Sequence, residues 1–137
     1  MKLVADVALY AADRVVLVRY EDKTKYDGEA GWFLPDDYLR HGEHPRDAAS
    51  RIIEEQLGIL APSLKLAEIE SFDGASWHLI FHFRGSLDEA RKISPGPNIA
   101  AARWFELAGL PSADEVAHGG WALEVIAKMQ AAEAPHQ

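Results

Sequence analysis

The chain has 137 residues, of which 48% are hydrophobic, and it contains no cysteine. This length and composition predict one domain, residues 1–137, with a substantial core, and they exclude a disordered chain or a disulfide framework. The 22 acidic and 14 basic residues give a formal charge of −8, which argues against nonspecific binding to nucleic acid. Nothing resembles a signal peptide or a membrane-spanning run, so we expect a cytoplasmic protein that binds neither nucleic acid nor membrane.

The first elements predicted are the strands 3–10 and 15–20, which are rich in β-branched and aromatic residues. Asp13 between them favours a turn, so we interpret the two strands as a hairpin. The polar segment 21–31 is expected to be a surface loop, either a solvated connection or a wall of a substrate pocket. Residues 32–35 then predict a short strand that ends at a proline.

The most strongly marked element is a helix predicted over Pro45–Leu57. Proline suits the first position of a helix, an aspartate is favourable in the first turn, and Gly58 can adopt the left-handed conformation that ends a helix. At about 100° per residue, one arc of this helix is apolar and carries Ala48, Ala49, Ile52, Ile53 and Leu57. Gln56 falls inside that arc, so we expect its amide to be buried and hydrogen-bonded. Arg51 is expected to contact Glu43 or Glu55.

Together with its flanking loops, this helix resembles the Nudix box, G-x5-E-x7-R-E-U-x-E-E-x-G-U, where U is an aliphatic residue. The matching residues are Glu43, Arg51, Ile53, Glu55, Gly58 and Ile59. The sequence departs from the pattern at Asp37, Ile52 and Gln56. Two aromatic segments, 32–35 and 103–105, resemble further markers of the Nudix hydrolase superfamily.

The resemblance implies an α+β fold, a Nudix-like α/β/α sandwich in which a mixed β-sheet lies between the box helix and a C-terminal helix. Family members carry carboxylates at the positions matching 52, 55 and 56, where they bind Mg²⁺ or Mn²⁺ against a substrate diphosphate. Only Glu55 is a carboxylate here, and Gln56 offers a neutral carbonyl oxygen. We therefore expect at most a weak Mg²⁺ or Mn²⁺ site at Glu55 and Gln56. The acidic residues common before the late aromatic marker are absent from 98–102.

Two other groups near the box are weaker candidates for a site. Asp36 and Asp37 stand where the family commonly has glycines, and they could bind a cation, but we favour a structural role in a turn. His41 and His44 form an H-x-x-H pair in a loop, which is weak evidence for a metal.

The rest of the chain predicts a second hairpin, 64–72 and 77–84, followed by a short helix at 87–93, a strand at 100–105 and a helix at 120–132. In strand 77–84, Trp77, Leu79, Phe81 and Phe83 alternate with His78, Ile80, His82 and Arg84. His78 and His82 would lie roughly 13 Å apart, too far to share a metal. Either histidine could face a ligand, but we favour histidines that are satisfied at the edge of a packed or wetted sheet face.

Two functions remain open at this level. One is a metal-dependent hydrolase of a nucleoside diphosphate linked to another group. Glu55 would be the one strong metal ligand, assisted by Glu43 and Gln56, and Arg51 would orient the carboxylates. The other is a binding module for a nucleotide-like small molecule, or a weakly active member, whose metal site is largely dismantled. The missing carboxylates place the binding module slightly ahead. No pattern in the sequence identifies the residues that bind the ligand. The sequence is compatible with an oligomer.

Overall fold

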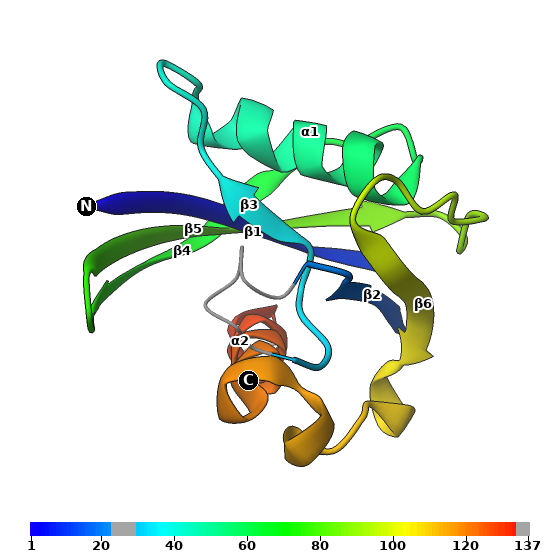
Figure 1. Ribbon diagram of the computed structural model, residues 1–137. Helices are drawn as coiled ribbons and strands as arrows, with labels where there is room; N and C mark the ends of the chain where they lie inside the picture. The colour runs from blue at the N-terminus through cyan, green and yellow to red at the C-terminus, as the bar shows by residue number, and fades with distance from the viewer. Residues whose placement is uncertain (23–29, 134–137) are drawn as a thin grey trace.

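A computed structural model describes residues 1–22 and 30–133 and places a mixed six-stranded sheet at the centre of the molecule (Figure 1). The strands are β1 (Lys2–Ala11), β2 (Arg14–Tyr20), β3 (Asp36–Tyr38), β4 (Lys65–Asp73), β5 (Trp77–Leu87) and β6 (Ile99–Glu106). Helix α1 (Pro45–Leu57) covers one face of the sheet and α2 (Ala117–Glu133) lies on the other, with the 3-10 helices η2 (Leu107–Gly109) and η3 (Ala113–Glu115) before it. The predicted α/β/α sandwich is confirmed.

Strand β1 is the central element of the sheet, whose order is β4-β5-β1-β2-β6. It runs parallel to β5 along its whole length, and the other edge is shared by two antiparallel partners. The end of β1 pairs with β2, as the predicted hairpin requires, whereas its start pairs with β3 in the register Val4↔Tyr38. Because neighbours lie on both edges and helices on both faces, β1 reads as a nearly continuous apolar run.

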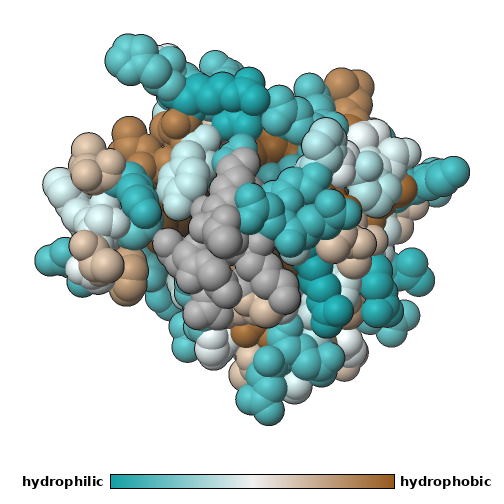
Figure 2. Space-filling model, viewed as in Figure 1, coloured by the Kyte–Doolittle hydropathy of each residue, from teal (hydrophilic) through white to brown (hydrophobic). Residues whose placement is uncertain are grey.

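The side chains of β2 alternate between two cores. Val16 and Val18 point toward α1, where they join Ile53 and Leu57, whereas Leu17 joins the core beneath α2 with Ile126. Full burial of each such aliphatic side chain contributes about 1.5 to 3 kcal/mol, so both helices are held mainly by these contacts. On the face shown in Figure 2 polar residues prevail over hydrophobic ones, which appear as separate patches.

The predicted strand at 32–35 is wrong. Trp32 and Phe33 form only isolated bridges, because the backbone N–H of Trp32 donates to Glu115 and that of Phe33 donates to Val18, on different neighbours. A continuous ladder begins only after Pro35, where β3 pairs with β1 over residues that the sequence favoured as a turn. Most of the predicted loop 21–31 lies outside the described residues.

The predicted short helix at 87–93 is also wrong. Strand β5 continues to Leu87, which is buried and pairs with Ala11 of β1. The chain then runs without regular structure against the end of α1, where Ser94 and Gly96 donate backbone hydrogen bonds to the carbonyls of Leu57 and Gln56, at 2.8 and 3.1 Å. The last carbonyls of a helix have no partners within the helix, and these two bonds satisfy such carbonyls of α1. A separate helix at 87–93 would not supply these donors.

Both long helices lie where the sequence predicts them. Helix α1 spans Pro45–Leu57, and α2 becomes regular after non-helical dihedral angles at His118, Gly119 and Gly120, which agrees with a start near residue 120. Among residues 1–22 and 30–133, no helix combines the length and apolarity needed to cross a membrane.

Candidate functional site

Both ends of helix α1 are fixed by local capping interactions. His44 is the N-cap residue, and its Nδ1 accepts a hydrogen bond from the backbone N–H of Arg46 at 3.0 Å. Gly58 ends the helix at φ 65°, and its N–H donates to the Glu54 carbonyl. His44 therefore has a structural role, and the described residues contain no group of three or more His, Cys, Asp or Glu arranged to hold a metal ion.

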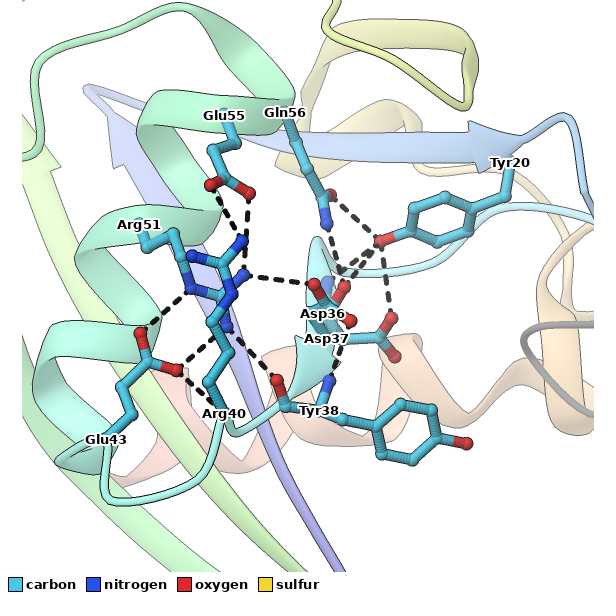
Figure 3. Close-up of polar contacts among 9 residues, drawn as sticks. All are labelled: Tyr20, Asp36, Asp37, Tyr38, Arg40, Glu43, Arg51, Glu55 and Gln56. Carbon is cyan, nitrogen blue, oxygen red and sulfur yellow. Dashed lines mark hydrogen bonds and ion pairs between the residues drawn. The ribbon is translucent and has the colours of Figure 1, made fainter.

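Arg51 on α1 is the hub of a network of carboxylates (Figure 3). Its guanidinium bonds both oxygens of Glu43, at 2.9 and 3.0 Å, and one oxygen of Asp37 at 3.1 Å. It also donates to the carbonyl of Tyr38 at 3.1 Å and approaches Glu55 at 3.5 Å. The expected contacts of Arg51 with Glu43 and Glu55 are both present. Asp37 lies in strand β3, not in the turn that we favoured, and pairs with Arg51.

The ion pair between Arg51 and Glu43 is strong because both side chains have little access to water. The Arg51 side chain is 10% exposed and that of Glu43 is 15% exposed. The bidentate hydrogen bond that Arg51 donates lowers the pKa of Glu43 to about 2. The same interaction raises the pKa of Arg51. Arg51 and Glu43 thus join the loop before α1 to the middle of the helix.

Glu55, the expected metal ligand, lies at the open edge of the network. Its side chain is 50% exposed and pairs with Arg40 at 3.1 Å as well as with Arg51. Arg40 is itself 63% exposed, and exposed pairs of this kind contribute only about 0.2 to 1 kcal/mol. Glu55 can therefore exchange Arg40 for another cation or for a ligand at little cost.

Gln56 is buried and hydrogen-bonded, as the sequence predicts. It is 8% exposed, and its Nε2 donates to the backbone carbonyl of Asp36 at 2.8 Å. Its Oε1 lies 2.9 Å from the hydroxyl of Tyr20, which in turn accepts the backbone N–H of Asp36 at 2.9 Å. Tyr20 was missed by the sequence reasoning, because its place beside α1 depends on the pairing of distant strands. Both ends of the Gln56 amide thus have partners.

Ile52 points away from this site. The residue is fully buried and packs with Ala5 of β1 and Ala48 of α1 in a small apolar cluster. A side chain at position 52 therefore faces the sheet, and of the three positions that matter in the family pattern only 55 is open to solvent.

A cavity of about 530 Å³ opens beside these residues, lined by Tyr20, Asp37, Arg40, Glu55, Gln56, Pro97, Asn98 and Ile99. The loop before β6 supplies the wall opposite α1. It approaches α1 so closely that a Cβ on Gly96 would lie 1.8 Å from the carbonyl oxygen of Glu55. Asn98 follows at φ 66°, and its Oδ1 accepts the backbone N–H of Asp22 at 2.7 Å.

A second polar cluster lies on the opposite face of the sheet, toward α2. His82 on β5 is fully buried, with Nδ1 2.7 Å from Asp6 of β1 and Nε2 2.9 Å from Glu70 of β4. Burial alone would lower the pKa of His82, but the bonds and charges of Asp6 and Glu70 outweigh it and raise this pKa to about 9. Burial also raises the pKa of Asp6. His82 is satisfied, as expected, but at a fully buried position on an inner strand and not at the edge of a sheet face.

Sequence reasoning missed Asp6 and Glu70, the partners of His82. The available signal was Asp6 itself, a charged residue within an otherwise apolar strand, which requires a buried partner. Glu70 borders a second cavity of about 330 Å³, and Asp37 lines both cavities.

The chain and its fold are similar to known proteins. A family model described as the NUDIX domain matches residues 2–125. The fold resembles a MutT NUDIX hydrolase from Burkholderia pseudomallei, with 22% identity, a TM-score of 0.72, and coverage of 90% of this chain and 95% of that one. It also resembles the NUDIX domain of Shewanella oneidensis NrtR complexed with ADP ribose, with 14% identity, a TM-score of 0.74, and coverage of 95% and 86%.

A MutT/nudix family protein from Enterococcus faecalis matches at 18% identity and a TM-score of 0.67, over 77% of this chain but only 43% of that one. At these identities the likeness establishes the fold alone. None of the curated proteins matches this chain.

Proposed function

The chain belongs to the NUDIX family, and from that premise we propose that residues 1–137 form a single domain that binds a nucleotide-like small molecule with a largely dismantled metal site. The observation that carries this proposal is the state of the three positions of α1 that hold a metal ion in the family pattern. Ile52 is buried in the core, Gln56 is bonded at both ends of its amide, and Glu55 alone is an exposed carboxylate.

This donor set does not fit a tight Mg²⁺ or Mn²⁺ site. These cations require several oxygen ligands in near-octahedral geometry, and at least one or two carboxylates usually supply the charge. Glu55 is the single carboxylate at these positions and already contacts two guanidinium groups, those of Arg40 and Arg51. Recruiting Gln56 Oε1 would cost its bond to Tyr20. Any metal binding at Glu55 and Gln56 is therefore weak.

The proposed ligand is a nucleoside diphosphate linked to another group. Support comes from the cavity beside α1, where the guanidinium of Arg40 is available to a phosphate because its pairing with Glu55 is exposed and weak. The NrtR domain, which has the same fold, is complexed with ADP ribose. The net charge of −8 argues against nonspecific binding to nucleic acid or to an anionic membrane surface. We further propose a cytoplasmic location, and an oligomer is compatible with the proposal.

The competing function is a metal-dependent diphosphate hydrolase, and one observation favours it. Glu43 and Glu55 occupy their family positions and both contact Arg51, so the residues that the pattern assigns to catalysis lie close together. In that case Glu55 would be indispensable, with Glu43 and Arg51 positioning it.

Calorimetric titration with ADP-ribose, with and without MgCl₂ or MnCl₂, tests the proposal when combined with product analysis. We expect binding that either cation changes less than threefold, and negligible hydrolysis. Glu55→Gln should preserve or tighten binding, because it removes a negative charge beside the phosphates, and Glu54→Gln on the same helix is the matched control. Metal-dependent hydrolysis that Glu55→Gln abolishes and Glu54→Gln preserves would instead establish the enzyme.

A further inference from the structure

The cavity on the α2 side of the sheet has aromatic walls and one well-fixed carboxylate. Its volume of about 330 Å³ falls within the range of small-molecule pockets, about 300 to 1,000 Å³. Phe72 and Trp121 contribute ring surfaces, and Ile80 contributes an apolar surface. Glu70, whose side chain is 32% exposed, is the pocket carboxylate held by the buried His82. An apolar slot with a convergent polar group is suited to a flat heterocycle.

His82 fixes both the position and the hydrogen-bonding character of Glu70. Each ring nitrogen of His82 lies within hydrogen-bond distance of a carboxylate oxygen, so each of the two contacts needs a proton. A neutral imidazole carries only one such proton, so the array contains either an imidazolium or a protonated carboxyl group. The His82 bond uses Oε1 of Glu70, which leaves Oε2 to accept a hydrogen bond from a ligand.

Packing alone does not account for this array. His82 and Asp6 are fully buried, and within the part of the chain that the structure describes, Oδ2 of Asp6 has no hydrogen-bond partner. Replacement of a buried ionic group by apolar residues is often neutral or stabilising, so burying these groups brings the fold no evident gain in stability. Positioning a carboxylate at the edge of a cavity is a role that apolar residues could not fulfil.

We propose that this cavity binds the nucleobase of the ligand, and that Glu70, positioned by His82 and Asp6, selects bases that present an exocyclic amino group. The ring would stack on the aromatic walls while the amino group donates to Glu70. Asp36 and Asp37 also line the cavity, and none of its described lining residues is a lysine or an arginine, so it is a poor site for a phosphate. This inference rests on the proposed nucleotide ligand and identifies how its base is read.

The placement of Asp37 supports one ligand spanning two cavities. Asp37 lines both the base cavity and the cavity beside α1, which contains Arg40. A ligand that passes Asp37 could place its ring near Glu70 and its phosphates near Arg40, so that each part meets complementary charge.

Three diphosphates that differ only at the base test the inference. ADP and GDP each present an exocyclic amino group, whereas IDP has a carbonyl at C6 and no amino group. We expect at least one of ADP and GDP to bind about tenfold more tightly than IDP. A difference of about tenfold is the effect of one hydrogen bond to a charged acceptor. Calorimetry on the full chain measures all three.

Glu70→Gln separates recognition from a merely structural role. The amide oxygen can keep the bond to His82 and turn an N–H toward the base, so the preference should fall to unity or reverse toward IDP. Glu68→Gln removes the same charge from an exposed position of β4 that does not line the cavity, and it should leave the preference unchanged. Phe72→Ala, at a ring that is 53% exposed, should weaken all three ligands about tenfold without unfolding the protein.

The outcomes distinguish this inference from the function on which it rests. If the diphosphates bind but IDP is equivalent to ADP and GDP, or if Phe72→Ala has no effect, the base site is wrong and the proposed function stands. If Glu70→Gln fails to fold, the diphosphate preference of the unmodified protein and the effect of Phe72→Ala still decide. If none of the three binds although ADP-ribose does, this inference falls and the proposed function stands; if ADP-ribose also fails to bind, both fall.

Discussion

The two faces of the sheet carry networks of similar composition in different surroundings. On the α1 face, Arg51 contacts three carboxylates, and one of them, Glu55, is half exposed. On the α2 face, His82 contacts Asp6, which is fully buried, and Glu70, which is 32% exposed. Each network places a basic group between acidic ones, but water reaches them unequally.

This difference decides what each network can do. An exposed carboxylate exchanges partners at little cost, so Glu55 is the adaptable member of the α1 network. A buried group cannot release its partner without a large desolvation penalty, so His82 keeps Glu70 in one position. The α1 face therefore offers an adjustable site, and the α2 face offers a preorganised one.

The largest expected effect comes from restoring the family carboxylates on the α1 face. Ile52→Glu with Gln56→Glu should lower the free energy of unfolding by about 4 kcal/mol or more in metal-free buffer, because position 52 is fully buried. Added Mn²⁺ should recover part of this loss if the new carboxylates bind it. Urea denaturation with and without MnCl₂ measures both effects, with Ile52→Leu as control, for which a loss below about 1.5 kcal/mol is expected.

Mn²⁺ affinity equal to that of the parent in a folded double variant would show that glutamates at positions 52 and 56 do not reach the site at Glu55. Gln56→Glu alone is a second arm with an unchanged core. It keeps an oxygen for Tyr20 but loses the donor to Asp36, so a smaller gain in affinity is expected.

Removal of the hub of the α1 network should have the next largest effect. Arg51→Met leaves Glu43 and Asp37 without their main partner while both remain mostly buried, and a loss of about 3 kcal/mol is expected. Arg46→Met, at an exposed arginine of the same helix, should change the free energy of unfolding by less than about 0.5 kcal/mol. Similar small losses for both variants in urea denaturation would show that the contacts of Arg51 with Glu43 and Asp37 contribute little to stability.

The α2 network predicts a dependence of stability on pH. The folded-state pKa of His82, about 9, lies above the ordinary value of 6.5, so protonation stabilises the fold fully below pH 6.5. That contribution is lost as pH rises from 6.5 through 9, by an amount on the order of 3 kcal/mol. Urea denaturation across this window measures the slope, which His78→Asn should retain. A flat profile would show that the array holds no additional proton in the folded state.

The smallest effect is expected at Tyr20, which links β2 to both α1 and β3. Tyr20→Phe removes the hydroxyl that accepts the backbone N–H of Asp36 and contacts Oε1 of Gln56, so a loss of about 1 kcal/mol is expected. Tyr10→Phe, whose half-buried hydroxyl contacts the sulfur of Met129, serves as control with a smaller loss. Thermal denaturation of both variants compares them, and equal losses would argue against a special role for the Gln56 amide.

Sequence patterns predicted the elements whose signals are local. The bounds of α1 follow from Pro45, the apolar period and Gly58, all within one helix length, and burial of Gln56 follows from its place on the same arc. The fold class was accessible for the same reason, since the residues that resemble the Nudix box lie within one short segment. The pairing of Arg51 with Glu43 was predictable because the loop and helix that carry them are adjacent in sequence.

Pairings between distant residues were decided only by the tertiary structure. Asp36–Tyr38 is a strand because β1 offers an unpaired edge there, and 87–93 is not a helix because β5 extends and the following loop packs on α1. His82 meets Asp6 across 76 positions of sequence, through the parallel register of β1 and β5. No local pattern encodes a register between strands so far apart, because burial and backbone pairing across the whole sheet select it.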